Sequence, residues 1–389
     1  MKKTSIAIFH ENFAQNGGAE RVVESLARLL PDADLFSSLV VQERLSSYMC
    51  KRGISCTWMQ HLPLPKRFFR YYFALYPFAA ASTRLDPYDL VLSSCFGFAK
   101  GIHKAPGALH VCYCHTPPRW LWRTDDFVKR EHLNPMARVL LFAFNSLMRP
   151  FDVRSSRQPD YFIANSEVVA ERISRSYGRE AHVIPPPIEI ERFTISDELP
   201  KDFFLVVSRL TAYKRIDLAI EACNKLHVRL KIIGEGPELR HLQNLAGPTI
   251  EFLGHLPDCQ VAQHLSQCRA ILFPGEEDFG IVPLEAAASG RPVVAFAAGG
   301  AMETVIDGTT GVLFPDQTSE GLANAMLSLD KITFNPQVLR EHAISFSTTV
   351  FHRRIVEFLQ SIPEVSVLPD LRLELNRAER SRLERTSVG

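Results

Sequence analysis

The sequence lacks the features of membrane-spanning and disulfide-bonded proteins. It contains no uninterrupted apolar run of about 18 residues, the length that a spanning helix requires. Its 8 cysteines form no Cys-x-x-Cys pair and have no zinc-ligand spacing. We therefore expect reduced, buried thiols in a cytoplasmic protein. The apolar run at residues 6–9 is too short for a signal peptide and predicts a first strand.

An excess of charge of one sign is also absent. The 389 residues include 44 Lys and Arg against 43 Asp and Glu, and the formal net charge is +1. No global field attracts nucleic acid, so a function based on overall charge is excluded. Hydrophobic residues make up 46% and charged residues 22%, as in soluble globular proteins. The length exceeds one ordinary core and predicts two domains.

What the sequence does contain is two series of alternating strand and helix patterns. The first series has predicted strands at 4–10, 90–94, 109–115, 161–165 and 182–184, and a helix at 18–30. The second has strands at 203–207, 229–233, 250–253, 270–273 and 292–296, and helices at 215–226 and 237–245. Between the series, Pro185-Pro186-Pro187 indicates an extended connector over about 185–200.

This alternation predicts an α/β fold with two Rossmann-like domains, each a doubly wound parallel sheet. We place the N-terminal domain at 1–188, the C-terminal domain at 189–345 and a charged tail without assigned function at 366–389. Ligands of such sheets bind beyond the carboxyl ends of the strands. The expected site is a central cleft where the two domains face each other.

The strongest functional signal lies at residues 273–286. A strand ends, a loop with Gly280 follows, and a helix is predicted to begin near Pro283. The free N–H groups and positive dipole end of such a helix suit a phosphate. Glu277 in the loop and Glu285 in the helix are carboxylates that accept hydrogen bonds from hydroxyl groups such as those of a ribose. The alternative is a solvated acidic loop beside a capped helix.

A second signal places two cations at the end of the strand 203–207. Arg209 and Lys214 at that position are able to clamp a diphosphate and stabilise its charge, a role that makes a metal ion unnecessary. The alternative is a basic helix start. The helix dipole disfavours cations there, so an anionic ligand explains the pair better. Arg215 beside them is interpreted as a solvated neighbour.

Three glycine-containing turns are weaker candidates. Gly17-Gly18 stands between the first strand and the first helix, but it is not a G-x-G-x-x-G motif, so dinucleotide binding is poorly supported. Gly234-Glu235-Gly236 and the segment ending at Leu256 also follow strands, where they can approach a nucleotide or its base. Each of them is equally explained as a simple turn.

His115 and an Asp-x-Asp sequence are two further candidates. His115 ends a predicted strand and precedes Thr116-Pro117-Pro118, which favours a position at the site; the alternative is a structural histidine. Asp32-Ala33-Asp34 matches the Asp-x-Asp pattern of metal-dependent glycosyltransferases. It follows the first helix and is predicted at the amino end of a strand, away from the ligand edge, so we expect no metal site there.

Residues 66–80 combine Lys66, Arg67 and Arg70 with seven aromatic residues. Such a mixture is typical of contact with an anionic membrane surface. We therefore expect peripheral contact with the inner face of the cytoplasmic membrane through this segment. The alternative is a buried helix.

Taken in order, these motifs resemble those of retaining glycosyltransferases of family 4, which have the GT-B fold. The resemblance covers about residues 4–360. It rests on 17–20, 115–117, 165–166, 208–210 with Lys214, 234–237, the Glu277 and Glu285 pair, and 299–300 before Glu303. It implies that the segment 346–365 is a helix returning to an acceptor-binding N-terminal domain, and that the C-terminal domain binds a nucleotide sugar.

The resemblance also implies roles for individual residues. The implied catalytic residues are His115, Glu277, Arg209 and Lys214, with no metal. The implied donor-binding residues are Gly17, Gly18, Arg209, Lys214, Gly234, Glu235, Leu256, Phe279, Gly280, Ile281, Val282 and Glu285.

The run at 114–122 is similar to that of bacterial mannosyltransferases of O-antigen and exopolysaccharide assembly. This similarity implies GDP-mannose as a substrate rather than a cofactor, and a glycan or a polyprenyl-diphosphate-linked saccharide as acceptor. The alternatives are a UDP-sugar donor, a GT-B epimerase acting on a sugar nucleotide, and a non-catalytic nucleotide-sugar-binding protein.

Overall fold

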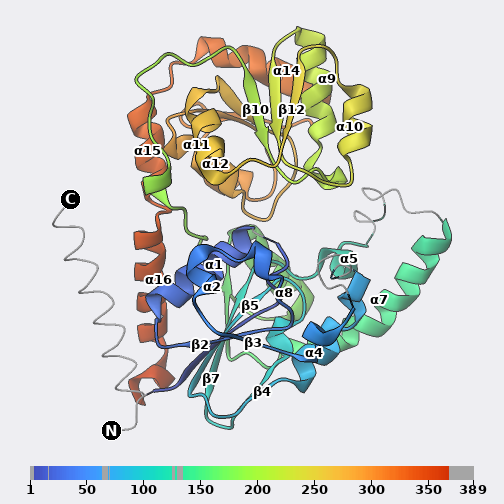
Figure 1. The fold of residues 1–389 in the computed structure, drawn as a ribbon, viewed down its shortest axis with the longest axis vertical. Helices are drawn as coiled ribbons and strands as arrows, with labels where there is room; N and C mark the ends of the chain where they lie inside the picture. The colour runs from blue at the N-terminus through green and yellow to red at the C-terminus, as the bar shows by residue number, and fades with distance from the viewer. Residues whose placement is uncertain are drawn as a thin grey trace. The chain divides into compact units, whose positions relative to one another are not determined.

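The computed structural model describes residues 4–15, 17–63, 69, 71–124, 128 and 135–367. The chain folds into two compact units (Figure 1). The first contains the described residues up to Pro187 and those from Thr349 onward, and the second is Ile188–Thr348. Each unit is built on its own parallel sheet.

The first unit contains a seven-stranded sheet in the order β3-β2-β1-β5-β7-β8-β9, in which every pairing is parallel. Its strands are β1 (Ile6–His10), β2 (Asp34–Ser37), β3 (Ile54–Cys56), β5 (Leu90–Cys95), β7 (Leu109–Cys114), β8 (Tyr161–Ala164) and β9 (His182–Val183). A separate pair is formed by β4 (Arg84–Leu85) and β6 (His103–Lys104). The helices are α1 (Gly18–Leu29), α2 (Ser47–Cys50), α4 (Tyr76–Ser82), α5 (Arg119–Trp122), α7 (Pro135–Ser155), α8 (Glu167–Tyr177) and α16 (Thr348–Ser361).

The central strands of this sheet are buried on both faces, as near-continuous apolar strands of parallel sheets require. One face packs against α1 and α16, and the other packs against α4, α7 and α8. Helix α16 comes from the end of the chain, yet Phe351, Ile355 and Leu359 are buried in the core of the first unit. His352 Nε2 of the same helix lies 2.9 Å from Ser25 Oγ of α1.

The second unit contains a six-stranded parallel sheet in the order β12-β11-β10-β13-β14-β15. Its strands are β10 (Phe204–Val207), β11 (Leu230–Ile233), β12 (Ile250–Gly254), β13 (Ala270–Phe273), β14 (Val293–Phe296) and β15 (Gly311–Phe314). Its helices are α9 (Ile216–Leu226), α10 (Leu239–Leu245), α11 (Asp258–Gln267), α12 (Ile281–Ala288), α13 (Ala301–Thr304), α14 (Ser319–Ser328) and α15 (Pro336–Ile344). Ile190 and Phe193, inside the predicted connector, are buried in the core of this unit.

The predicted α/β class with two doubly wound parallel sheets is confirmed. Two helix starts differ from the prediction. Helix α9 begins at Ile216 because Arg215 has the left-handed conformation, with φ of 52°. Helix α12 begins at Ile281, two residues before Pro283, because Gly280 with φ of 89° supplies the turn that precedes it. In both sheets the strand order reverses beside the first strand of the unit, between β1 and β5 and between β10 and β13.

The structure also bears on the predictions for the cysteines and for membrane-spanning helices. All eight cysteines are free, but Cys50, Cys56 and Cys259 are exposed, so only part of the set is buried as expected. Among the described residues, no helix is both long enough and apolar enough to cross a membrane.

Candidate functional site

The candidate site of the second unit lies where its strand order reverses. Doubly wound sheets bind ligands at this point, beyond the carboxyl ends of the strands. The loop after β10 carries Lys214, and the loop after the neighbouring strand β13 carries Glu277. The two side chains form an ion pair and are 15% and 20% exposed, so both retain contact with solvent. The sequence placed these residues in separate motifs, and the fold brings them into contact.

The two loops are packed backbone against backbone at this pair. A Cβ atom on Gly275 would lie 2.8 Å from Cα of Lys214, closer than real Cβ atoms approach. The glycine therefore sets the distance between the loop after β10 and the loop after β13. Any larger residue would move the Lys214 backbone away from the loop that holds Glu277.

The glycine turn after β11 supports the loop after β10 in the same way. Gly234 has φ of 136°, and a Cβ atom there would lie 1.9 Å from the carbonyl oxygen of Ser208. Leu210 N–H donates to the carbonyl oxygen of Glu235 at 2.9 Å. The Glu235 side chain is exposed and the Leu256 side chain is half-buried after β12. The turn thus supports the loop after β10, which agrees with the alternative interpretation of this segment as a structural turn. Its contact with a ligand stays a prediction.

Helix α12 starts at the same edge of the sheet. No side chain caps its first turn, so its amino end has the free N–H groups that bind anions. Gly299 and Gly300 pack against the backbone of the loop before it. A Cβ atom on Gly300 would lie 2.2 Å from Cα of Phe279, and Gly300 N–H donates to the carbonyl oxygen of Glu277 at 2.9 Å. The backbone of residues 299–300 therefore supports residues 277–280 through direct contact.

The remaining predicted residues of this unit lie close to these loops in the sequence. Arg209 follows β10 by two residues and is exposed, whereas Glu285 in α12 is only 6% exposed. Ile281 and Val282 form the first turn of α12 and are half-buried. Arg215 pairs with Asp217 at 3.0 Å, so its charge is balanced within its own helix start. This local pairing fits its interpretation as a neighbour of the site.

In the first unit, His115 belongs to a hydrogen-bonded group that spans three strands. His115 follows β7, is 9% exposed, and its Nε2 lies 2.9 Å from Ser94 Oγ of β5. The same hydroxyl lies 3.0 Å from Nδ1 of His10 in β1. His10 is buried, and burial lowers its pKa to about 3, so the ring is neutral near pH 7. Ser94 of β5, itself in contact with His10 of β1, thus orients the ring of His115.

Gly17 and Gly18 lie at the amino end of α1, beside the point where the strand order of the first sheet reverses. Gly17 N–H donates to Glu20 Oε2 at 3.0 Å. Gly17 has φ of −121°, which any residue adopts, so its backbone conformation does not require glycine. A close approach of a ligand remains the functional interpretation of this pair.

A buried carboxylate at the same edge was not predicted from the sequence. Glu11 directly follows β1, is 3% exposed, and accepts hydrogen bonds from the N–H groups of Phe98 and Ala99, each at 2.9 Å. Burial raises the pKa of this carboxyl group. An acidic residue immediately after a buried strand was the available signal. The contacts show that Glu11 holds the loop after β5.

The Asp-x-Asp sequence lies at the other end of the sheet. Asp34 is the first residue of β2, and Tyr88 donates its hydroxyl hydrogen to Asp34 Oδ2 at 2.8 Å. The predicted position at the amino end of a strand is therefore observed. This end is opposite to the edge that carries His115 and Gly17.

Comparison with known proteins identifies glycosyltransferase sequences in both units. The family model described as Glycosyltransferase Family 4 matches residues 16–192, and the one described as Glycosyl transferases group 1 matches residues 201–331. The two matches follow each other along the chain and together include all the predicted site residues.

Individual relatives are distant. The chain is 26% identical over 238 residues to an alpha-1,3/1,6-mannosyltransferase of Homo sapiens, with 52% of this chain and 54% of that protein covered. It is 28% identical over 192 residues to a GDP-mannose-dependent alpha-(1-6)-phosphatidylinositol monomannoside mannosyltransferase of Mycolicibacterium smegmatis, with 41% and 50% covered. The chain thus spans about half the length of the curated relatives it matches.

Solved structures agree on the fold. The crystal structure of HepE from Anabaena in complex with UDP and glucose covers 92% of this chain and 100% of its own, with a TM-score of 0.67 and 20% sequence identity. At this identity the likeness shows the fold alone. The chain therefore has the GT-B fold, and each of its two units contains a sequence that matches a glycosyltransferase model.

Proposed function

We propose that this protein is a retaining glycosyltransferase that moves a hexose from a nucleotide sugar, GDP-mannose, onto a glycan or a polyprenyl-diphosphate-linked saccharide during bacterial surface polysaccharide synthesis. The ion pair between Lys214 and Glu277, beside the uncapped start of α12, carries the proposal. It combines a cation and free N–H groups for a diphosphate with a carboxylate for sugar hydroxyls.

Each residue of the site then has a distinct task. Lys214 and Arg209 hold the diphosphate, together with the first turn of α12. Glu277 accepts hydrogen bonds from hydroxyls of the donor sugar, and Glu285 binds the ribose. In the first unit, His115 contacts the transferred sugar and the Gly17–Gly18 turn lies near the phosphates. The two cations and the helix end supply the positive charge, so the reaction proceeds without a divalent ion.

The reaction breaks the bond between the anomeric carbon and the diphosphate oxygen. Positive charge develops on the sugar and negative charge on the diphosphate, which Lys214 and Arg209 stabilise. The acceptor hydroxyl attacks the anomeric carbon from the face that the diphosphate leaves, and its proton passes to a departing phosphate oxygen. Positioning and electrostatics account for most of the rate acceleration.

The relatives' names favour mannose, since two of them are mannosyltransferases and one uses GDP-mannose. A UDP-sugar is the second candidate donor because HepE binds UDP. A thermal-shift screen of nucleotide sugars separates the two. A donor at 100 times its dissociation constant stabilises the folded protein by about 2.7 kcal/mol. Greater stabilisation by UDP-glucose than by GDP-mannose would overturn the choice of donor but not the proposed reaction.

Transfer assays with variants test the clamp itself. We expect Lys214→Ala and Arg209→Ala to lower transfer about 10²- to 10³-fold, as for other groups that stabilise charge in a transition state. Lys231→Ala is the matched control because Lys231 pairs with Glu251 on neighbouring strands, away from the loops of the site. Transfer by Arg209→Ala within about threefold of the unaltered protein, or loss of activity in chelator, would contradict the mechanism.

The same assay decides between the proposed reaction and the two alternatives. Incubation with the donor alone tests for an isomerised sugar nucleotide, the product of an epimerase. Donor binding without transfer to any acceptor tried would indicate a binding protein. The proposal predicts that sugar is transferred only when an acceptor is present.

A further inference from the structure

Helix α7 is attached to the first unit by one narrow face. Its buried residues Asn145, Met148, Asp152 and Ser155 recur at intervals of three and four, so they lie on one side of the helix. Asp152 anchors that side, since it forms a buried ion pair with Lys100 at 2.5 Å and accepts hydrogen bonds from Trp122 and Tyr177. Figure 1 shows α7 at the periphery of the unit, extending away from the sheet.

A different face of α7 exposes large apolar side chains. Met136, Leu140 and Leu147 are 73%, 63% and 74% exposed, and Val139 is 67% exposed. The intervals of four and seven place Met136, Leu140 and Leu147 in one row. Soluble proteins rarely leave such contiguous apolar surface uncovered unless it binds something. The row covers most of a helix of 21 residues, about 30 Å long.

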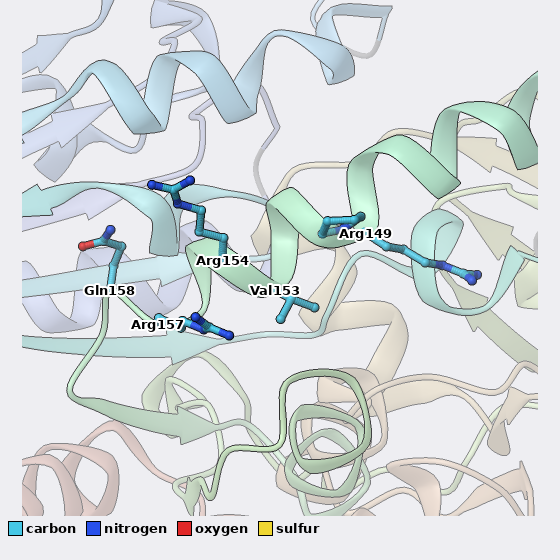
Figure 2. A pocket seen from close by; sticks show the side chains of 6 residues that line it. Arg149, Val153, Arg154, Arg157 and Gln158 are labelled. Atoms are coloured by element: carbon cyan, nitrogen blue, oxygen red, sulfur yellow. The ribbon is translucent and has the colours of Figure 1, made fainter.

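The exposed charged residues of α7 and of the turn that follows it are arginines. Arg154, seven residues after Leu147, continues the row, and Arg157 is exposed just beyond the end of the helix. Arg138 and Arg149 are also exposed, but they lie on the side of the helix opposite to the row. Figure 2 shows Arg149, Arg154 and Arg157 around a surface hollow at the C-terminal half of the helix. The only acidic residue of α7 is Asp152, whose side chain is fully buried against Lys100. Within α7 itself, the exposed charged residues are therefore arginines.

Neighbouring aromatic residues extend the apolar surface. Phe73 and Phe78 are 41% and 58% exposed. Phe73 packs against Phe144 of α7 with ring centroids 5.5 Å apart, and Phe78 packs against Phe151 at 6.2 Å. Both phenylalanines belong to the segment 66–80, of which residues 66–68 and 70 lie outside the described residues. Tyr76, Ala79 and Ala80 of that segment are buried, so these side chains are not available for the membrane contact predicted for the segment.

We propose that the exposed face of α7, with Phe73 and Phe78 beside it, rests on an anionic lipid bilayer surface. An apolar row that continues into exposed arginines suits a helix that lies in the plane of an anionic membrane interface. The charge favours lipid over a second copy of this chain, because two copies would bring their arginines together. The inference goes beyond the proposed transfer reaction, and it would hold the first unit near a lipid-linked acceptor.

Sedimentation with vesicles tests the proposal on the full-length protein. The vesicles contain phosphatidylcholine alone or mixed with phosphatidylglycerol, at low and at high salt. We expect binding only to the anionic vesicles and its loss at high salt. The double variant Leu140→Glu with Leu147→Glu should weaken binding at least ~10-fold. The matched control is Leu327→Glu, a 53% exposed leucine of α14 in the second unit, which should bind like the unaltered protein.

The arginines provide a separate test of the same surface. Arg154→Gln and Arg157→Gln should each lower the affinity for anionic vesicles about fivefold and reduce its dependence on salt. Full binding by the Leu140 and Leu147 variant would overturn the proposal, as would concentration-dependent self-association that this variant abolishes. Stabilisation by nucleotide sugars is measured on the same variants. If the unaltered protein binds donor but not vesicles, the proposed membrane contact of α7 is wrong and the proposed function is unaffected.

Discussion

The hydroxyl group of Ser94 joins His10 and His115, which come from different segments of the chain. A serine hydroxyl carries one hydrogen, so Ser94 donates to one ring nitrogen and accepts from the other. The contacts of 3.0 and 2.9 Å therefore couple the tautomers of the two histidines, that is, which ring nitrogen of each carries the hydrogen. Because His10 is buried and neutral, it supports the orientation of His115 without adding charge beneath the site.

Ser94→Ala tests this link. We expect transfer to fall about fivefold through kcat, since loss of one positioning hydrogen bond costs about 1 kcal/mol. Ser93→Ala is the matched control, because Ser93 is the adjacent residue of β5 and bonds His110 Nε2 at 2.8 Å on the other face of the sheet. Steady-state kinetics of both variants provide the measurement. Equal losses for the two variants would show that the role of Ser94 is structural.

His110 makes the stability of the first unit depend on pH. Burial lowers its pKa to about 3, whereas an unfolded histidine has a pKa near 6.5. Between these values only the unfolded chain binds the proton, so stability decreases as pH falls from about 6.5 toward 3. The slope from this residue is about 1.4 kcal/mol per pH unit.

His110→Gln should remove that slope. Urea unfolding at pH 7, 6 and 5, followed by tryptophan fluorescence, provides the measurement because all 3 tryptophans (Trp58, Trp120 and Trp122) belong to the first unit. His10, with a similarly lowered pKa, remains in the variant and accounts for a residual dependence. An unchanged difference in stability between the variant and the parent across this range would contradict the assignment.

At the level of elements, the loop after β10 is shaped by the turn that follows β11. Gly234 combines a positive φ with a backbone atom that blocks any Cβ. Gly308 also has a positive φ, of 71°, but no atom lies within 4 Å of its Cβ position. A substitution at Gly308 therefore measures the strain of a positive φ alone, whereas a substitution at Gly234 adds the clash with the Ser208 backbone.

Gly234→Ala should destabilise the second unit by more than about 3 kcal/mol and weaken donor binding, because the loop with Arg209 and Lys214 must shift. Gly308→Ala should cost only about 1 kcal/mol and leave donor binding unchanged. Thermal unfolding with a dye, with and without nucleotide sugar, compares the variants. Similar behaviour of the two would show that the contact with Ser208 is unimportant.

Helix prediction succeeded where apolar residues recur at helical intervals and failed where they do not. The helix predicted at 18–30 is α1, which has a single buried face. Helix α7 was not predicted because its apolar residues occur on buried and exposed sides alike, which obscures the period. The proposed lipid partner would explain the exposed apolar face of α7. The periodicity of the sequence does not reveal a partner of this kind.

For the whole molecule, the last helix is part of the first unit. Ile355 of α16 is 2% exposed in a core that includes Leu92, Val111 and Ile163 of the first sheet. Ile355→Ala should lower the stability of the first unit by about 2–5 kcal/mol. Tryptophan fluorescence should detect the change, since it reports on that unit. Leu339→Ala, a fully buried residue of α15 in the second unit, should leave the fluorescence transition unchanged.

The sequence by itself determined the fold class, most strand positions, and the loops that carry Arg209, Lys214, Glu277 and His115. It did so because apolar periodicity and the chemistry of glycine and proline act within a few residues of each position. Only the tertiary structure decided that Lys214 meets Glu277, that His10 and Ser94 support His115, and that Glu11 is buried. These contacts depend on strand order, which brings distant loops to one sheet edge through interactions that no local pattern encodes.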